Sequence, residues 1–143
     1  MFMNSWAFWA LLSAVFAALT GLFAKLGVQQ INADLATLIR TLIICGLLSL
    51  FVALTGKWSN PLQLSGKTWG YLILSAAATG ASWVCYFRAL QLGQLFQVAP
   101  IDKLSLVMVA IFAVLFLGER PSLREWLGLG LVAAGVLLLI WRR

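Results

Sequence analysis

Residues 6–26 read WAFWALLSAVFAALTGLFAKL, an apolar run in which Lys25 is the single charged side chain. About 20 residues of helix, rising 1.5 Å each, cross the roughly 30 Å hydrocarbon layer of a bilayer. The preceding segment, Met1-Phe2-Met3-Asn4-Ser5, lacks the Lys or Arg that opens a cleavable signal peptide. We therefore expect a first transmembrane helix that is retained in the mature protein.

Four more apolar stretches of similar length follow. The five predicted helices are Trp6–Leu26, Leu35–Gly56, Trp69–Leu90, Val98–Leu117 and Leu123–Trp141. Their connections are short and rich in turn residues, and Trp residues fall near most helix ends, where indole rings prefer the membrane interface. The sequence predicts an all-α integral membrane protein, with residues 1–143 forming a single domain, a bundle of five transmembrane helices.

Composition excludes several classes of protein. The 143 residues are 63% hydrophobic and 10% charged, too apolar for one soluble core. The formal charge is +6, but the basic residues are scattered between apolar runs and form no stripe for nucleic acid. There is no His, and Cys45 and Cys85 stand alone, so we expect no metal site, no cofactor and no enzymatic activity.

Charged residues at membrane depth are the main functional clue, because each costs at least ~2.5–3.5 kcal/mol near the bilayer centre on insertion scales. They gather in the half of the membrane opposite the N-terminus: Lys25, Asp34, Arg40, Arg88, Asp102 and Lys103. Lys25 and Arg88 lie near helix ends, from which a long side chain can reach the interface. Arg40 and Lys103 lie deeper, and the short side chain of Asp102 cannot reach water.

Asp102 is the only acid more than one turn inside a predicted span, so it is either protonated or paired with a cation at similar depth. Arg40 and Arg88 are the candidate partners, and a static salt bridge is as plausible as a functional role. Pro100, two residues earlier, removes a backbone donor and is expected to kink or open the helix where Asp102 and Lys103 enter it. Irregular backbone at this depth usually lines a cavity.

The deep charges also indicate what such a cavity would bind. Arg40, Arg88 and Lys103 against Asp102 give 3 − 1 = +2, which favours an anionic or carboxylate-bearing substrate over a bare cation. Trp83 and Tyr86, spaced i and i+3, would add an aromatic wall, although ordinary helix packing explains them equally well.

The orientation of the chain is weakly encoded. Four basic residues on the N-terminal side oppose two at the other end, but counting the embedded cations turns this into four against six. A chain inserted in both directions could form an antiparallel dimer, which would recreate the inverted repeats used for alternating access.

Several motifs together resemble the EamA family of the drug/metabolite transporter superfamily. They are Ile39-Arg40-Thr41, Ala89-Leu90-Gln91-Leu92-Gly93, Val98-Ala99-Pro100-Ile101-Asp102-Lys103-Leu104-Ser105, Phe116-Leu117-Gly118-Glu119, Trp126-Leu127-Gly128 and Gly135. The resemblance covers essentially the whole chain. The usual member of that family has ten helices in two inverted halves, so this sequence resembles one five-helix half.

The resemblance implies a multi-pass transporter of a small metabolite or drug in a bacterial or archaeal plasma (inner) membrane, working by alternating access as a homodimer. From the charges we expect membrane lipid and an anionic or zwitterionic small molecule as partners, and no nucleic acid. The expected path residues are Arg40, Arg88, Asp102, Lys103, Trp83, Tyr86 and Ser105, with the helix break at Pro100. The first helix has no acid, unlike the small multidrug resistance branch, which disfavours proton-coupled export of lipophilic cations by that branch's mechanism.

Two other functions stay open. One is a flippase for a polar or phosphorylated lipid headgroup, since a phosphate would suit the same positive vestibule. The other is a non-transporting membrane subunit of a larger complex.

Overall fold

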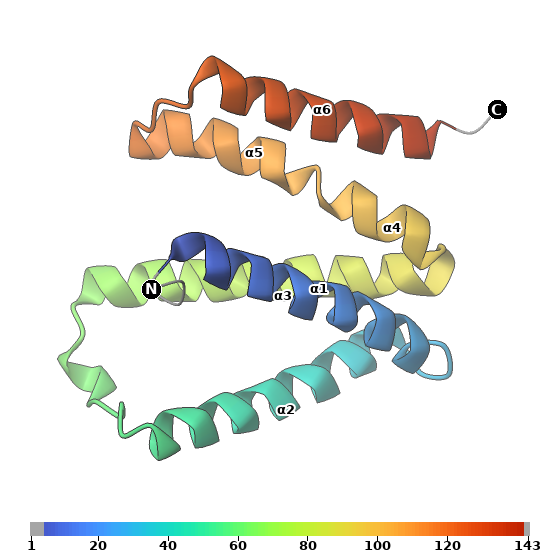
Figure 1. The fold of residues 1–143 in the computed structure, drawn as a ribbon. Helices are drawn as coiled ribbons and strands as arrows, with labels where there is room; N and C mark the ends of the chain where they lie inside the picture. Colours follow the sequence, from blue (N-terminus) through green and yellow to red (C-terminus); the bar gives the residue numbers. More distant parts are fainter. Residues whose placement is uncertain (1–4, 142–143) are drawn as a thin grey trace. The chain divides into compact units, whose positions relative to one another are not determined.

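The computed structural model describes residues 5–141, which form helices and no strands. The elements are α1 (Trp6–Gly27), α2 (Ala33–Leu54), η2 (Pro61–Gln63), α3 (Gly66–Leu92), α4 (Leu95–Asp102), α5 (Ser105–Phe112), η3 (Ala113–Leu117) and α6 (Leu123–Ile140) (Figure 1). Five helical segments are long and apolar enough to cross a membrane, with α4, α5 and η3 together making the fourth. The predicted fold class is confirmed.

The helix bounds differ from the predicted ones by at most three residues, and local capping explains the difference in α2. The Asn32 side-chain oxygen accepts hydrogen bonds from the backbone N–H groups of Asp34 (2.8 Å) and Leu35 (3.3 Å). This cap starts α2 at Ala33, two residues before the predicted start. The same helix ends at Leu54, just before the turn at Gly56, whose φ of 64° favours glycine.

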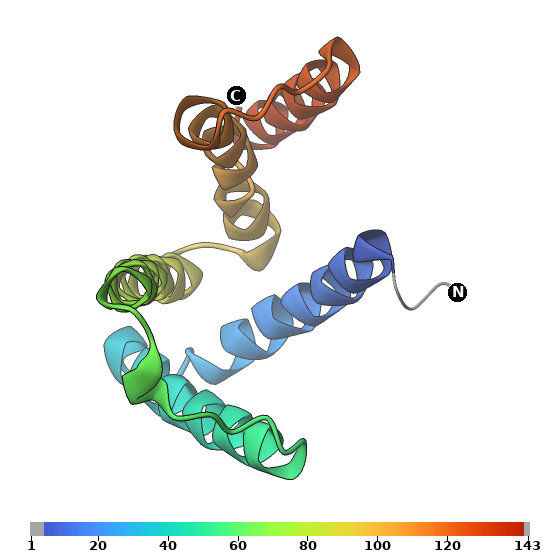
Figure 2. The ribbon, with the colours of Figure 1, turned by 90° about the vertical axis from the view of Figure 1, so that its left-hand side faces the viewer.

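The chain divides into two compact units, one ending at Leu92 and the other beginning at Gly93. In the first unit, α1, α2 and α3 come together around the α1–α2 loop, and α2 and α3 diverge from there (Figures 1 and 2). The buried residues gather at the same end: Val28 and Leu90 are 0% exposed, and Phe87 and Ala33 are 3% exposed. The core of this unit therefore lies beside the loop.

Side-chain hydrogen bonds fasten the α1–α2 loop to the end of α3. The Gln91 amide donates to the carbonyls of Val28 (3.1 Å) and Ile31 (2.6 Å). The Lys25 ammonium donates to the carbonyl of Leu90 at 2.6 Å. Carbonyls in the loop and near the end of α3 thus find side-chain donors.

In the second unit, α6 packs along α4 and α5. Between α4 and α5 the helix is interrupted at Lys103 and Leu104, whose N–H groups bond three residues back, to Pro100 and Ile101 (both 3.0 Å). The π-helical turn η3 ends at Gly118, with φ 69°. A capping box then starts α6, in which Ser122 and Glu125 bond each other's backbone N–H groups.

Candidate functional site

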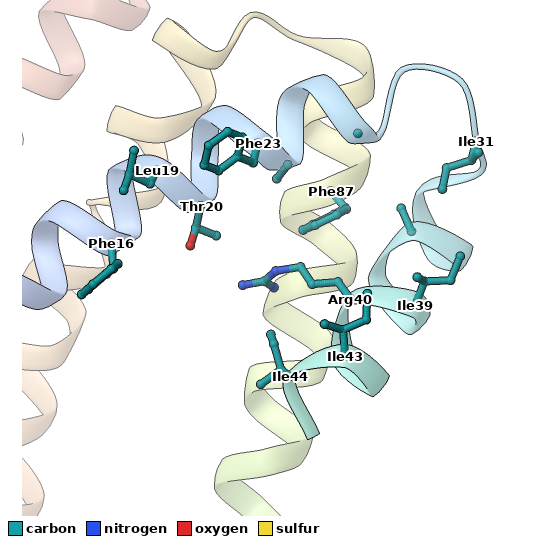
Figure 3. Close-up of a pocket in the computed structure, with 13 residues that line it drawn as sticks. Phe16, Leu19, Thr20, Phe23, Ile31, Ile39, Arg40, Ile43, Ile44 and Phe87 are labelled. Carbon is teal, nitrogen blue, oxygen red and sulfur yellow. The ribbon is translucent and has the colours of Figure 1, made fainter. Parts of the chain in front are cut away.

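A cavity of ≈ 630 Å³ lies in the first unit, between α1 and α2 with one residue of α3. Thirteen residues line it, and their side chains are apolar except at two positions. Arg40 supplies the charge and Thr20 supplies a hydroxyl. Figure 3 shows the guanidinium of Arg40 projecting into the cavity, with Thr20 on the facing helix.

Helical spacing explains why these residues line the cavity together. Phe16, Thr20 and Phe23 are separated by four and three residues, so they share one face of α1. Arg40 on α2 is flanked at the same spacing by Ala36 and Ile43. The cavity is therefore formed by two facing helix stripes, closed on one side by Phe87 of α3.

The Arg40 guanidinium is held against an aromatic ring. Its Cζ lies 4.3 Å from the centroid of Trp83 and 5.7 Å from that of Phe87, both within the ≈ 6 Å range of a cation–π contact. Arg40 and Trp83 are both half-buried. The structure thus brings together two of the residues singled out in the sequence.

Arg40 has no carboxylate partner within the described part of the first unit, residues 5–92. The sequence up to Leu92 contains a single acid, Asp34. Arg88 forms a bidentate ion pair with Asp34, in which Nε lies 2.9 Å from Oδ1 and Nη2 lies 2.7 Å from Oδ2. The guanidinium of Arg40 therefore contacts aromatic rings and no anion of its own unit.

The Asp34 pairing gives Arg88 a partner that the sequence analysis did not consider. The hydropathy pattern predicts a helix that begins at Leu35, which places Asp34 in a loop and leaves Asp102 as the only acid more than one turn inside a predicted span. Because Asn32 caps the helix, Asp34 lies in its first turn, facing the last turns of α3. An Asn followed two residues later by an acid is a helix-start signal that could have placed it.

The remaining expected residue of the first unit is Tyr86, which is half-buried on α3 and is not among the residues that line the cavity. The walls contributed by Phe16, Phe23 and Phe87 were missed. No sequence signal separates these Phe side chains from the many apolar residues around them. Only the rotation of each helix selects them.

The other expected residues belong to the second unit. Asp102 closes α4, and its Oδ2 lies 3.4 Å from the Nζ of the adjacent Lys103. Pro100 lies within α4, one turn before the interruption at Lys103 and Leu104. Ser105 is the first residue of α5 and is exposed. The expected path residues thus form two groups, one in each unit.

The chemistry available to these groups is binding. Across residues 5–141, no cluster of three or more His, Cys, Asp and Glu side chains is arranged to hold a metal ion. A guanidinium offers a planar set of N–H donors that matches carboxylate and phosphate oxygens. The cavity is therefore equipped to hold an anionic group beside an apolar one.

In a comparison with known proteins, residues 4–141 match the family described as "EamA-like transporter family". An uncharacterized transporter in the cobO 3' region of Sinorhizobium sp is 62% identical over 136 residues, which cover 95% of this chain and 96% of that protein. A probable 4-amino-4-deoxy-L-arabinose-phosphoundecaprenol flippase subunit, ArnE of Yersinia pestis (strain Pestoides F), is 32% identical over 85 residues, 59% of this chain and 75% of that one. No solved structure matches.

The family match and the relatives' names indicate a transporter and not an enzyme, and they confirm the resemblance drawn from the motifs. Five helices able to span a membrane agree with that assignment. The chain is a multi-pass membrane protein and belongs to the EamA-like transporter family.

Proposed function

We propose that this protein moves a small organic anion across the membrane by alternating access, with Arg40 as the group that binds the anion. The observation that carries the proposal is the guanidinium in a cavity whose other lining side chains, Thr20 apart, are apolar. The only acid of the first unit is already bound to Arg88. A substrate anion would supply the missing countercharge.

The depth of Arg40 supports a functional role. The first residue of α2 is Ala33, and Arg40 lies seven residues after it. This separation corresponds to about 10 Å of helix rise. A cation at that depth is expensive, and such residues commonly mark a substrate pathway. Stacking on Trp83 offsets part of the cost, since a cation–π contact contributes about 0.5–2 kcal/mol.

Counterflow in proteoliposomes tests the proposal. Vesicles loaded with an unlabelled organic anion are diluted into the same anion carrying a radiolabel, and a panel of anions is screened. We expect Arg40→Gln to lower the exchange rate about tenfold or more, because the charged partner of the substrate is lost. Lys57→Gln, on an exposed loop residue outside the spans, is the matched control and should exchange as the wild type does. Equal exchange by both variants would contradict the assignment of Arg40.

We further propose that Asp102, Lys103 and Ser105 take part in translocation, with the backbone break that follows Pro100 as their setting. The interruption between α4 and α5 and the adjacent ion pair support this. Asp102→Asn in the same counterflow assay keeps the side-chain size and removes the charge. Unchanged exchange would remove this group from the proposal.

The working unit in this proposal is a homodimer of antiparallel chains in a bacterial inner membrane. Five spans place the two ends of the spanning region on opposite sides, and the basic residues give little orientation bias. The relatives come from Sinorhizobium sp and Yersinia pestis, which supports the location. Single cysteines at Ser59 and Gln94, with Cys45 and Cys85 replaced by alanine, should each be labelled from both sides of the membrane. Labelling of each from one side only would exclude dual topology.

A lipid flippase is the second candidate, favoured by the relative named as a flippase subunit. The cavity walls Phe16 and Phe23 are 60% and 64% exposed, so acyl chains could contact them. Faster transbilayer movement of a fluorescent phospholipid in proteoliposomes, without counterflow of any soluble anion, would select this function. A non-transporting subunit would show neither activity.

A further inference from the structure

We infer that the substrate is an amphipathic monoanion: one carboxylate or phosphodiester charge on an apolar body that is preferably aromatic. This inference rests on the proposed function and specifies the substrate class of the same cavity. It depends on three properties of the lining: its charge, its supply of hydrogen-bond donors and acceptors, and its shape.

Charge limits the substrate to a single negative group. Among the described residues that line the cavity, Arg40 is the only one with a charged side chain. A dianion would leave one charge without a partner against apolar walls, and an uncompensated charge in such surroundings is costly. A cation or a zwitterion needs a carboxylate, but the one acid of the first unit is held by Arg88 at 2.7 Å and is not on the lining.

Hydrogen bonding excludes highly polar bodies. Apart from Arg40, Thr20 has the only polar side chain among the lining residues that the structure describes. A sugar or polyol would have to give up several hydrogen bonds to water and would recover few of them here. An apolar body loses none, and it gains from leaving water.

Shape favours a flat apolar body beside the charge. The ≈ 630 Å³ volume lies within the roughly 300–1,000 Å³ range of small-molecule pockets. Phe16 and Phe23 of α1 and Phe87 of α3 lie around the space into which Arg40 projects (Figure 3). Aromatic rings pack against such side chains in edge-to-face or offset geometry. Trp83 contacts the guanidinium but does not line the cavity, so an anion would meet the N–H groups of Arg40 from the cavity side.

Equilibrium binding to the whole chain in phosphatidylcholine nanodiscs tests the inference, because this lipid carries no net charge. The probe is radiolabelled 2-naphthoate. The competitors keep the naphthalene body and change its charge: 2-naphthalenemethanol is neutral, 2-naphthylmethylamine is a cation and 2,6-naphthalenedicarboxylate is a dianion. Acetate keeps the charge and removes the body. We expect each of the four to bind about tenfold or more weakly than 2-naphthoate.

Variants check that binding occurs at the cavity. Arg40→Gln should weaken 2-naphthoate binding about tenfold or more, while Lys57→Gln should bind as the wild type does. Because Arg40→Gln removes an unpaired charge from apolar surroundings, it should not impair folding, and a monodisperse size-exclusion profile verifies this. The competition series on the wild type is independent of any variant.

The source of the monoanion is resolved by a second competitor, dihexanoyl phosphatidylglycerol, a phosphodiester lipid. Stronger competition by it than by unlabelled 2-naphthoate indicates a ligand from the membrane, and the reverse indicates one from water. Both results support the monoanion class.

Equal competition by the amine or the dicarboxylate, or full binding by Arg40→Gln, would overturn it. Preferential, Arg40-dependent binding of 2-naphthoate without counterflow would instead overturn the transport proposal and leave the substrate class standing. Counterflow of an amine would overturn the substrate class and leave the transport proposal standing.

Discussion

The guanidinium of Arg40 lies over the ring of Trp83, at 4.3 Å from the centroid, and points into an apolar cavity. A cation–π contact needs no hydrogen-bond acceptor, so it does not by itself occupy the N–H donors of the guanidinium. The ring therefore helps to hold the guanidinium in place as well as easing the cost of the charge. Trp83 is a positioning residue for Arg40.

Replacing Trp83 should weaken anion binding even though the ring does not line the cavity. The contact is worth about 0.5–2 kcal/mol, so Trp83→Leu should raise the Kd for 2-naphthoate about 2- to 30-fold. Trp83→Phe, which keeps a smaller π-face, should fall between the leucine variant and the wild type. Trp58→Phe, at an exposed loop residue, is the control, and nanodisc binding is the measurement. Wild-type affinity in Trp83→Leu would remove the ring from this role.

Sequence reasoning identified Arg40 and Trp83 as candidates because their depth in apolar runs is visible from the sequence alone. It did not identify the pair formed by Arg88 and Asp34. That contact depends on where α2 begins, and a two-residue error at this end moved Asp34 out of the helix. Contacts between residues 54 positions apart depend on helix rotation, which the sequence leaves open here.

At the scale of elements, the end of α3 acts as a clasp for the α1–α2 loop. The clasp consists of Lys25, Asp34, Arg88 and Gln91 with the carbonyls they bind. It lies at the packed end of the first unit, while α2 and α3 diverge away from it. The clasp therefore connects α1 and α2, the two helices that form most of the cavity, to the end of α3.

Removing the two donated hydrogen bonds of Gln91 should loosen this loop. Gln91→Met keeps the side-chain length but loses the bonds to Val28 and Ile31. Each such bond contributes roughly 0.5–1.5 kcal/mol, so amide hydrogen exchange in residues 28–35 should speed up about fivefold or more. Gln63→Met, on the exposed η2 turn, is the matched control. Unchanged exchange in Gln91→Met would show that the clasp does not hold the loop.

The interruption between α4 and α5 was only partly accessible from the sequence. Pro100 indicates a missing backbone donor, and the structure places a turn with three-residue bonds directly after it. The position of the gap at Lys103 and Leu104, and the π-helical turn of η3, depend on packing in the second unit. The residue types show no pattern from which the position of the interruption or the π-helical turn could be predicted.

For the whole molecule, the number and class of helices followed from length and hydropathy alone. Bilayer thickness fixes how many residues a span needs, and five runs meet that need. Which faces meet did not follow, because helices that are apolar all round show no stripe that points inward. Arg40 was therefore predicted as a path residue, whereas its apolar surroundings emerged only from the fold.

The central claim, that this chain exchanges an amphipathic anion across the membrane through the Arg40 cavity, is tested most directly by counterflow with 2-naphthoate. Wild-type proteoliposomes preloaded with the unlabelled anion should show a transient accumulation of label above the external concentration, because alternating access couples the two directions. Empty vesicles and Arg40→Gln vesicles should show no such overshoot. An overshoot of equal size in Arg40→Gln, or none in the wild type while Arg40-dependent binding persists, would contradict the account.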